Sequence, residues 1–199
     1  MSVRYRKHHN RRDAGRGAAY IARLLFAFLL IASPFAALPA QAEASTEFAG
    51  IVIRPGDGTV TYAYVPLDEP VSGIELLRRS GISLLTAGFG GLGEGVCRIE
   101  QTGCDIGPCR TRLCQTGDRN SPYWRYFQMN SSGEWVASPL GGSATKIAPG
   151  EVDGWSWTPD EALLPDVQIG EIPALAGAGN DPDRAHFAHY DANGNLIEQ

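Results

Sequence analysis

The sequence is short of the side chains that most enzymes use for catalysis. After residue 42 its only histidines are His186 and His189, three positions apart, whereas the helix of a zinc protease spaces its two histidines four apart. No serine stands in a Gly-x-Ser-x-Gly elbow, the turn that exposes the nucleophile of α/β-hydrolases. These absences argue against zinc and hydrolase chemistry, and we expect the histidine pair to be an exposed, inert part of a C-terminal tail.

Positive charge is also scarce after residue 42. Residues 43–199 contain ten Lys and Arg side chains and 21 Asp and Glu side chains, a net charge of −11, against −5 for the whole chain. Nucleic acids and anionic lipid surfaces are bound mainly through clustered Lys and Arg. The composition therefore argues against a nucleic-acid partner and against an anionic membrane surface.

The first 42 residues have the organisation of a secretory signal. Seven Lys and Arg side chains precede an apolar stretch from Leu24 to Ile31, and Pro34 interrupts its weak continuation. A membrane span needs roughly 20 consecutive apolar residues, whereas a signal needs fewer. Ala40-Gln41-Ala42 then provides the A-x-A pattern of a cleavage site. We predict a signal peptide over residues 1–42, cleavage after Ala42, and an exported protein with no stable membrane span after cleavage.

Two questions about the N-terminus stay open at this level. An uncleaved segment would act as a membrane anchor, and the sequence does not exclude that alternative. Arg11-Arg12 permits the twin-arginine route, but Asp13-Ala14-Gly15 lacks the hydrophobic positions that follow the arginine pair in such signals. We therefore expect the general secretory route, which delivers the protein to the periplasm, the cell surface or the medium.

The four cysteines all lie within 18 residues, with the spacing C-x6-C-x4-C-x4-C. In an oxidising compartment, an even number of cysteines is typical of disulfides, and four cysteines allow three pairings that the sequence does not distinguish. Zinc and iron-sulfur sites favour C-x2-C knuckles, and this spacing provides none. The glycine-rich segment Gly88–Gly93 lacks the strand and helix that flank a phosphate loop. We predict that two disulfides, and no metal, pin this glycine-rich loop: Cys97, Cys104, Cys109 and Cys114.

The pattern of residues 43–158 predicts an α+β domain. A hairpin is indicated by two β-rich runs, Phe48–Arg54 and Thr59–Val65, on either side of a Pro-Gly-Asp-Gly turn. Ser72 is a candidate N-cap for one short helix that ends near Ser80-Gly81. Further strands are expected over 82–86, 123–129, 134–138 and 154–157. We predict a small mixed sheet with this helix on one face.

The remaining segment, residues 159–199, is acidic and rich in Pro, Ala and Gly over its first part. Such a composition buries little apolar surface and is typical of a linker. Asn193-Gly194 lies between two short strand-like runs and favours a hairpin turn. We predict a largely flexible tail with a terminal hairpin.

Several of these segments together resemble a known family. They are Ser72–Leu77, the glycine and cysteine loop, Tyr123–Phe127, Gly133–Trp135 and Pro149–Trp157. In this order they are similar to bacterial exported domains related to the C-terminal domain of transcobalamin, over about residues 48–158. The resemblance implies a β-grasp-like fold. It also implies a corrinoid as one ligand, although transcobalamin encloses its corrinoid with a separate helical domain that has no counterpart in residues 43–199.

Aromatic residues in the late strands are the best candidates for a binding surface. Side chains alternate between the two faces of a strand, so Trp124 and Tyr126 should face one way and Tyr123 and Phe127 the other. One set should enter the core, while the other could form an exposed platform for a flat ligand or a partner. The alternative is that all of them pack in the core. The candidate surface comprises Tyr123, Trp124, Tyr126, Trp135, Trp155 and Trp157.

Together these features predict an exported, non-enzymatic binding module without a cofactor. Its partner would be a small molecule, with a corrinoid as one candidate, or a protein of the cell envelope. The alternative is a secreted hydrolase or a thiol-redox enzyme that acts through the cysteine window.

Overall fold

The computed structural model describes residues 47–179 and 181–199. The predicted signal peptide and its cleavage site after Ala42 lie outside the described residues. In chain order, the elements are β1 (Phe48–Arg54), β2 (Val60–Pro66), β3 (Val71–Ser72), α2 (Gly73–Arg79), β4 (Leu84–Gly88), η1 (Gly90–Leu92), β5 (Glu94–Ile99), β6 (Thr102–Gly103), α3 (Ile106–Arg112), β7 (Tyr123–Met129), β8 (Trp135–Ala137), α4 (Gly141–Ala144), β9 (Lys146–Ile147), β10 (Val152–Thr158), η2 (Ile169–Glu171), α5 (Ile172–Leu175), β11 (His186–Tyr190) and β12 (Leu196–Glu198).

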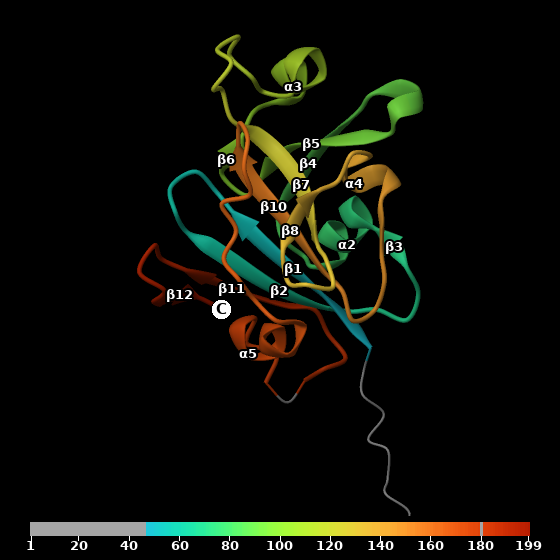
Figure 1. Cartoon of the computed structure of the whole chain (residues 1–199), viewed down its shortest axis with the longest axis vertical. Coiled ribbons are helices and arrows are strands. Elements are labelled where there is room, and N and C mark those ends of the chain that lie inside the picture. Colours follow the sequence, from blue (N-terminus) through green and yellow to red (C-terminus); the bar gives the residue numbers. More distant parts are fainter. Residues whose placement is uncertain (1–46, 180) are drawn as a thin grey trace, which may run out of the picture. The chain divides into compact units, whose positions relative to one another are not determined.

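A seven-stranded sheet with the order β12-β11-β2-β1-β10-β7-β8 forms the body of the protein (Figure 1). The two central strands, β1 and β10, are parallel, while the remaining neighbours pair antiparallel. A hairpin, a helix and a late strand that returns parallel to the first define a β-grasp-like arrangement. The predicted α+β fold class is therefore confirmed.

The N-terminal hairpin and its helix form where the sequence predicts them. Strand β1 has the predicted bounds, and the Oγ of Ser72 caps α2 by accepting the N–H of Glu75 at 3.2 Å. Gly81 follows the helix with a φ of +80°, a conformation that favours glycine. The buried face of α2, formed by Ile74, Leu76 and Leu77, packs on the sheet.

The opposite face of the sheet is covered by the segment that follows β10. Leu164, Val167 and Ile172 are buried there, in one apolar cluster with Val52 of β1 and Phe127 of β7. The expectation that the segment after residue 158 buries little is therefore corrected. Its apolar residues follow neither a helical nor a strand period, so their contact with the sheet is a tertiary feature that periodicity does not reveal.

The terminal hairpin is part of the main sheet. Strand β11 pairs with β2 over its whole length and carries β12 at its outer edge. Ala188 of β11 is fully buried. A lone hairpin is marginally stable in water, and pairing with β2 supplies the support that it needs.

The cysteine window forms a small subdomain of its own. Strands β4, β5 and β6 make an antiparallel sheet, and α3 packs against it, above the main sheet in the view of Figure 1. The prediction of a single short helix is therefore wrong, because α3, α4 and α5 are also present. The segment between the cysteines is predicted to be a loop, yet Gly107 and Pro108 lie in the first turn of α3, where the missing N–H of proline costs no helical bond.

Among the described residues, no helix is both long enough and apolar enough to cross a membrane.

Candidate functional site

Three of the six predicted surface aromatics lie in the core. Trp124, Tyr126 and Trp155 have exposed fractions of 7%, 5% and 2%, and all three pack in the cluster beneath α2. The expected exposed platform is therefore corrected, and the alternative of ordinary core packing holds for these three side chains. The reason is the strand alternation itself, since the face that carries them is the one that α2 covers.

Cross-strand pairing fixes the positions of these rings. Tyr126 lies opposite Trp155, and Trp124 lies opposite Trp157, between β7 and β10. Their ring centroids are 4.8 Å and 5.5 Å apart, respectively, within the range of favourable aromatic pairs. These four rings make a continuous aromatic layer, of which only Trp157 is partly exposed.

The other two predicted residues lie elsewhere. The guanidinium of Arg125 lies 5.9 Å from the ring centroid of Tyr123 and donates to the backbone carbonyls of Pro159 and Asp160. The Nε1 of Trp135 donates to the Pro165 carbonyl at 3.0 Å, on the face that the C-terminal segment covers. The six residues therefore divide between the two faces of the sheet and form no single platform.

A cavity of about 250 Å³ nevertheless brings four of the six together. It lies where strands β7 and β10, the cysteine subdomain and helix α4 meet. Helix α4 lies close both to β10 and to the cysteine subdomain. A Cβ on Gly142 would lie 2.5 Å from Trp155, and one on Gly93 would lie 2.4 Å from the Oγ of Ser143. The lining residues are Ile74, Glu94, Gly95, Val96, Leu113, Tyr123, Trp124, Arg125, Tyr126, Ala137, Ser138, Gly141, Gly142 and Trp155.

The cavity opens at an unpaired edge of β7. Its lining includes Tyr123 and Arg125 from one face of β7 and Trp124 and Tyr126 from the other. A single cavity can touch both faces of a strand only at a free edge. Strand β8 pairs with Phe127–Met129 alone, so among the described residues no strand lies beside the first half of β7 on this side.

Two polar groups of the lining residues are buried without a partner. The hydroxyl of Tyr126 and the Nε1 of Trp155 have no hydrogen bond to any described residue. Burial raises the pKa of Tyr126 far above its ordinary value, and the nearby charge of Asp153 raises it further. The phenol therefore stays neutral and keeps its donor.

Asp153 is a buried carboxyl next to this cluster. It is fully buried on β10, and neither oxygen has a hydrogen bond of normal geometry within the described chain. Burial raises the pKa of Asp153 well above 3.8, an effect that the adjacent Tyr126 hydroxyl opposes. No simple sequence signal marks such a residue, because Asp153-Gly154 is a dipeptide typical of an exposed turn.

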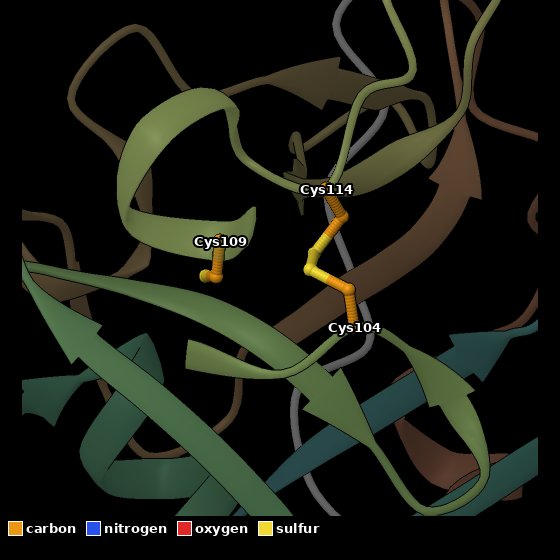
Figure 2. Close-up of side chains that lie close together, drawn as sticks. All are labelled: Cys104, Cys109 and Cys114. Carbon is orange, nitrogen blue, oxygen red and sulfur yellow. A yellow bond between two sulfur atoms is a disulfide. The ribbon is translucent and has the colours of Figure 1, made fainter. Parts of the chain in front are cut away.

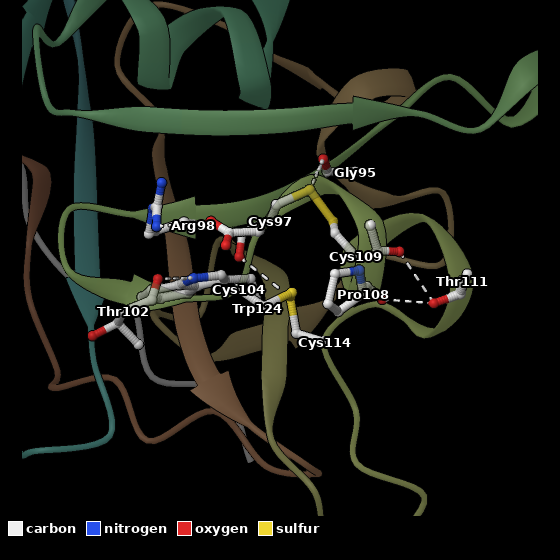
Figure 3. Close-up of a disulfide and its surroundings, with 12 residues drawn as sticks. Gly95, Cys97, Arg98, Thr102, Cys104, Pro108, Cys109, Thr111, Cys114 and Trp124 are labelled. Carbon is white, nitrogen blue, oxygen red and sulfur yellow. Dashed lines mark hydrogen bonds and ion pairs between the residues drawn. A yellow bond between two sulfur atoms is a disulfide. The ribbon is translucent and has the colours of Figure 1, made fainter.

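The four cysteines form two disulfides, Cys97–Cys109 and Cys104–Cys114. The first bond joins β5 to α3, as Figure 3 shows, and both of its cysteines are fully buried. The second bond is partly exposed. It lies at the side of the subdomain where the indole of Trp124 donates to the Thr102 carbonyl at 3.0 Å. The prediction of two disulfides is confirmed, and the structure supplies the pairing that the sequence left open.

Three of the sulfur atoms lie close to one another. The Sγ atoms of Cys104, Cys109 and Cys114 all lie within 4.8 Å of one another, and Figure 2 shows the three side chains. A metal site would require thiolates, and each of these sulfurs is already bonded in a disulfide. In this oxidised form the group holds no metal ligand.

The histidines are placed differently from the exposed pair that the sequence suggests. His189 is half-buried, with its Nδ1 2.7 Å from the Oγ of Thr61 and its Nε2 3.2 Å from the Oε1 of Glu100. A hydroxyl, an imidazole and a carboxylate in series suggest a nucleophile with its base, but Thr61 is 1% exposed and out of reach of a substrate. His186 contacts the Asp181 carbonyl at the surface.

Comparisons with protein-family models, with curated proteins and with solved structures found no match to this chain. The geometry of the site is therefore the basis for the function proposed below.

Proposed function

We propose that the protein is an exported, non-enzymatic binding module, and that its site is the cavity at the free edge of β7. The observation that carries this proposal is the cavity itself, about 250 Å³ in volume and lined by aromatic rings with an open strand edge at its mouth. Apolar walls with a few polar groups are typical of ligand sites. The two disulfides indicate a non-reducing environment, which supports export.

The size of the cavity narrows the ligand. Pockets for drug-sized molecules span roughly 300–1,000 Å³, so this cavity suits a smaller molecule or one bulky side chain of a protein partner. A corrinoid is much larger and would contact only the rim. The resemblance to the transcobalamin domain keeps a corrinoid among the ligands to be tried, as a prediction.

Nuclear magnetic resonance with a small apolar probe tests the proposal. We expect indole to shift the resonances of Trp124, Tyr126 and Gly142, with thermal-shift assays of a corrinoid panel run in parallel. Shifts confined to residues outside the cavity, or no shift at millimolar indole, would refute the site.

A second candidate function, thiol–disulfide exchange, is favoured by the closeness of three sulfur atoms. An external thiol that attacks the Cys104–Cys114 bond would form a mixed disulfide and release one of the two cysteines as a thiolate. That thiolate would then attack the Sγ of Cys109, form a new disulfide and release the Cys97 thiolate. Turnover of a disulfide substrate that is abolished by Cys104→Ser, in a protein that still folds, would favour this function over the binding module.

A further inference from the structure

We propose that the cavity takes an extended peptide, which adds to β7 as a continuation of β8 and inserts one bulky apolar side chain. This inference rests on the proposed function and specifies the ligand class. An extended peptide can hydrogen-bond to the unpaired N–H and C=O groups of a strand edge, because its own N–H and C=O groups have the spacing of a β-ladder.

The hydrogen bonding of β7 shows which of its groups are available. The N–H of Ser138 donates to the Tyr126 carbonyl at 3.0 Å, one step beyond the end of β8. In an antiparallel ladder, the N–H and C=O of one residue point to the same side, and alternate residues share that side. The N–H and C=O of Trp124 therefore point to the same free edge as those of Tyr126, where no described strand meets them.

The chain of the protein turns away at the point where a strand could continue. After Ser138 it passes Pro139 and enters α4, and the cavity occupies the space that the next residues of β8 would fill. The opposite wall is the start of β5, where β6 pairs only with Arg98 and Ile99. Within the described chain, the first half of β7 and the start of β5 therefore border the cavity with strand edges that no other strand pairs on that side.

The side chain that enters the cavity follows from the pairing. A peptide residue opposite Trp124 would project its side chain to the same face as Trp124. On that face the cavity is lined by Ile74, Tyr126 and Trp155. An aromatic or large aliphatic side chain opposite Trp124 fits this lining, while a residue without a side chain would leave it empty.

The test uses three synthetic peptides and the full-length protein. The first is N-acetyl-Phe-Thr-Thr-amide, whose threonines favour the extended form. The second carries an N-methyl group on the phenylalanine nitrogen, which removes the donor to the Trp124 carbonyl. The third has glycine in place of phenylalanine. Amide resonances and hydrogen exchange of Trp124 and Tyr126 report the position of the peptide.

We expect the first peptide to shift these two amides and to slow exchange of the Trp124 N–H, since Ser138 already lies opposite Tyr126. Loss of a hydrogen bond that leaves a buried acceptor unpaired should weaken binding about tenfold or more for the N-methylated peptide. The glycine peptide should bind more weakly still. Equal affinity of the first two peptides, or shifts that map outside the cavity, would overturn the inference.

Two substitutions on β8 provide a matched pair. Ala137 is exposed and lines the cavity, so Ala137→Trp should block the mouth and abolish peptide binding. Val136 is 51% exposed and does not line the cavity, so Val136→Trp should leave binding unchanged. An amide spectrum of each variant verifies the fold, and binding by a folded Ala137→Trp variant would contradict the placement.

The outcomes separate this inference from the proposed function. If indole shifts the cavity resonances but the N-methylated peptide binds as well as its parent, the site stands and the strand-addition inference fails. If neither indole nor any peptide shifts them, both fail.

Discussion

His189 and Glu100 are joined by a contact of 3.2 Å between Nε2 and Oε1, which ties β11 to the residue that follows β5. Glu100 adopts a φ of +51° at this point, a conformation that is uncommon for residues other than glycine. The other nitrogen of His189 meets the buried Oγ of Thr61. One imidazole thus links the C-terminal hairpin to the main sheet and to the cysteine subdomain.

Replacement of His189 should therefore destabilise the protein. His189→Ala leaves the buried Thr61 hydroxyl without its partner, a loss of about 1–3 kcal/mol in the free energy of unfolding. His186→Ala is the matched control, because the His186 ring bonds a surface carbonyl and lies 6.4 Å from the Tyr64 ring centroid, and it should change the free energy by less than about 0.5 kcal/mol. Urea denaturation measures both, and equal effects of the two substitutions would show that the Thr61 and Glu100 contacts contribute nothing.

Asp153 should make stability depend on pH. Its pKa in the folded protein is raised well above 3.8 by burial, so the folded state binds the proton more tightly than the unfolded state. Stability from this group is fully present below pH 3.8 and is lost as the pH rises through the higher, folded pKa. The stability of Asp153→Asn relative to the unsubstituted protein should therefore increase from about pH 4 to about pH 8. Urea midpoints of both proteins at these two pH values test the sign, and a relative stability that is greater at the lower pH would contradict it.

The two disulfides should differ in how readily they are reduced. Each closes a short loop, with sequence separations of 12 for Cys97–Cys109 and 10 for Cys104–Cys114, and each should contribute about 2–3 kcal/mol in the chain-entropy model. Only the second is partly exposed, so a mild thiol should reduce it first. Mass spectrometry after alkylation identifies the order, and earlier modification of Cys97 and Cys109 would contradict it.

Loss of the Cys104–Cys114 bond should loosen the wall of the cavity. Leu113, which lines it, and Cys114 have positive φ values of 53° and 69°, a strained conformation for both residues. Without the bond, nothing covalent holds Cys114 there. We expect Cys104→Ser with Cys114→Ser to speed hydrogen exchange near Leu113 and to lower the melting temperature by several degrees, while the β signal in circular dichroism persists.

How much of this molecule the sequence predicts depends on the range of the interaction. Strands β1 and β7 have the predicted bounds because alternation is a local signal, and Ser72 caps α2 because capping is local too. The burial of Leu164 and Ile172 depends on the sheet face opposite α2. Residues 159–178 reach that face through irregular chain and the very short helices η2 and α5, which are too short to produce a periodic apolar pattern. The disulfide pairing depends on α3, a helix that the sequence pattern does not predict.

The sequence predicts most of the aromatic residues of the candidate site, but not the cavity that they line. The aromatic strands stand out in the sequence, and four of their six predicted members line the cavity. The cavity exists because β8 stops at Ala137 while β7 starts at Tyr123, and strand register is a tertiary property that composition does not encode. The histidine contact escapes sequence-based prediction because Glu100 lies 89 positions from His189.

Gly73, which lies against the ring of the cavity-lining residue Tyr126, should tolerate no added methyl group. A Cβ there would lie 2.6 Å from the ring of Tyr126, which is packed against Trp155 and cannot move away. Gly73→Ala should therefore lower the free energy of unfolding by about 1–3 kcal/mol and weaken indole binding. Gly107 is also in the first turn of a helix, but a Cβ on it would meet no atom within 4 Å, so Gly107→Ala should instead be neutral or stabilising by up to about 1 kcal/mol. Thermal unfolding of the two variants side by side measures the difference. Equal stability of the two variants would mean that the Tyr126 ring is free to shift.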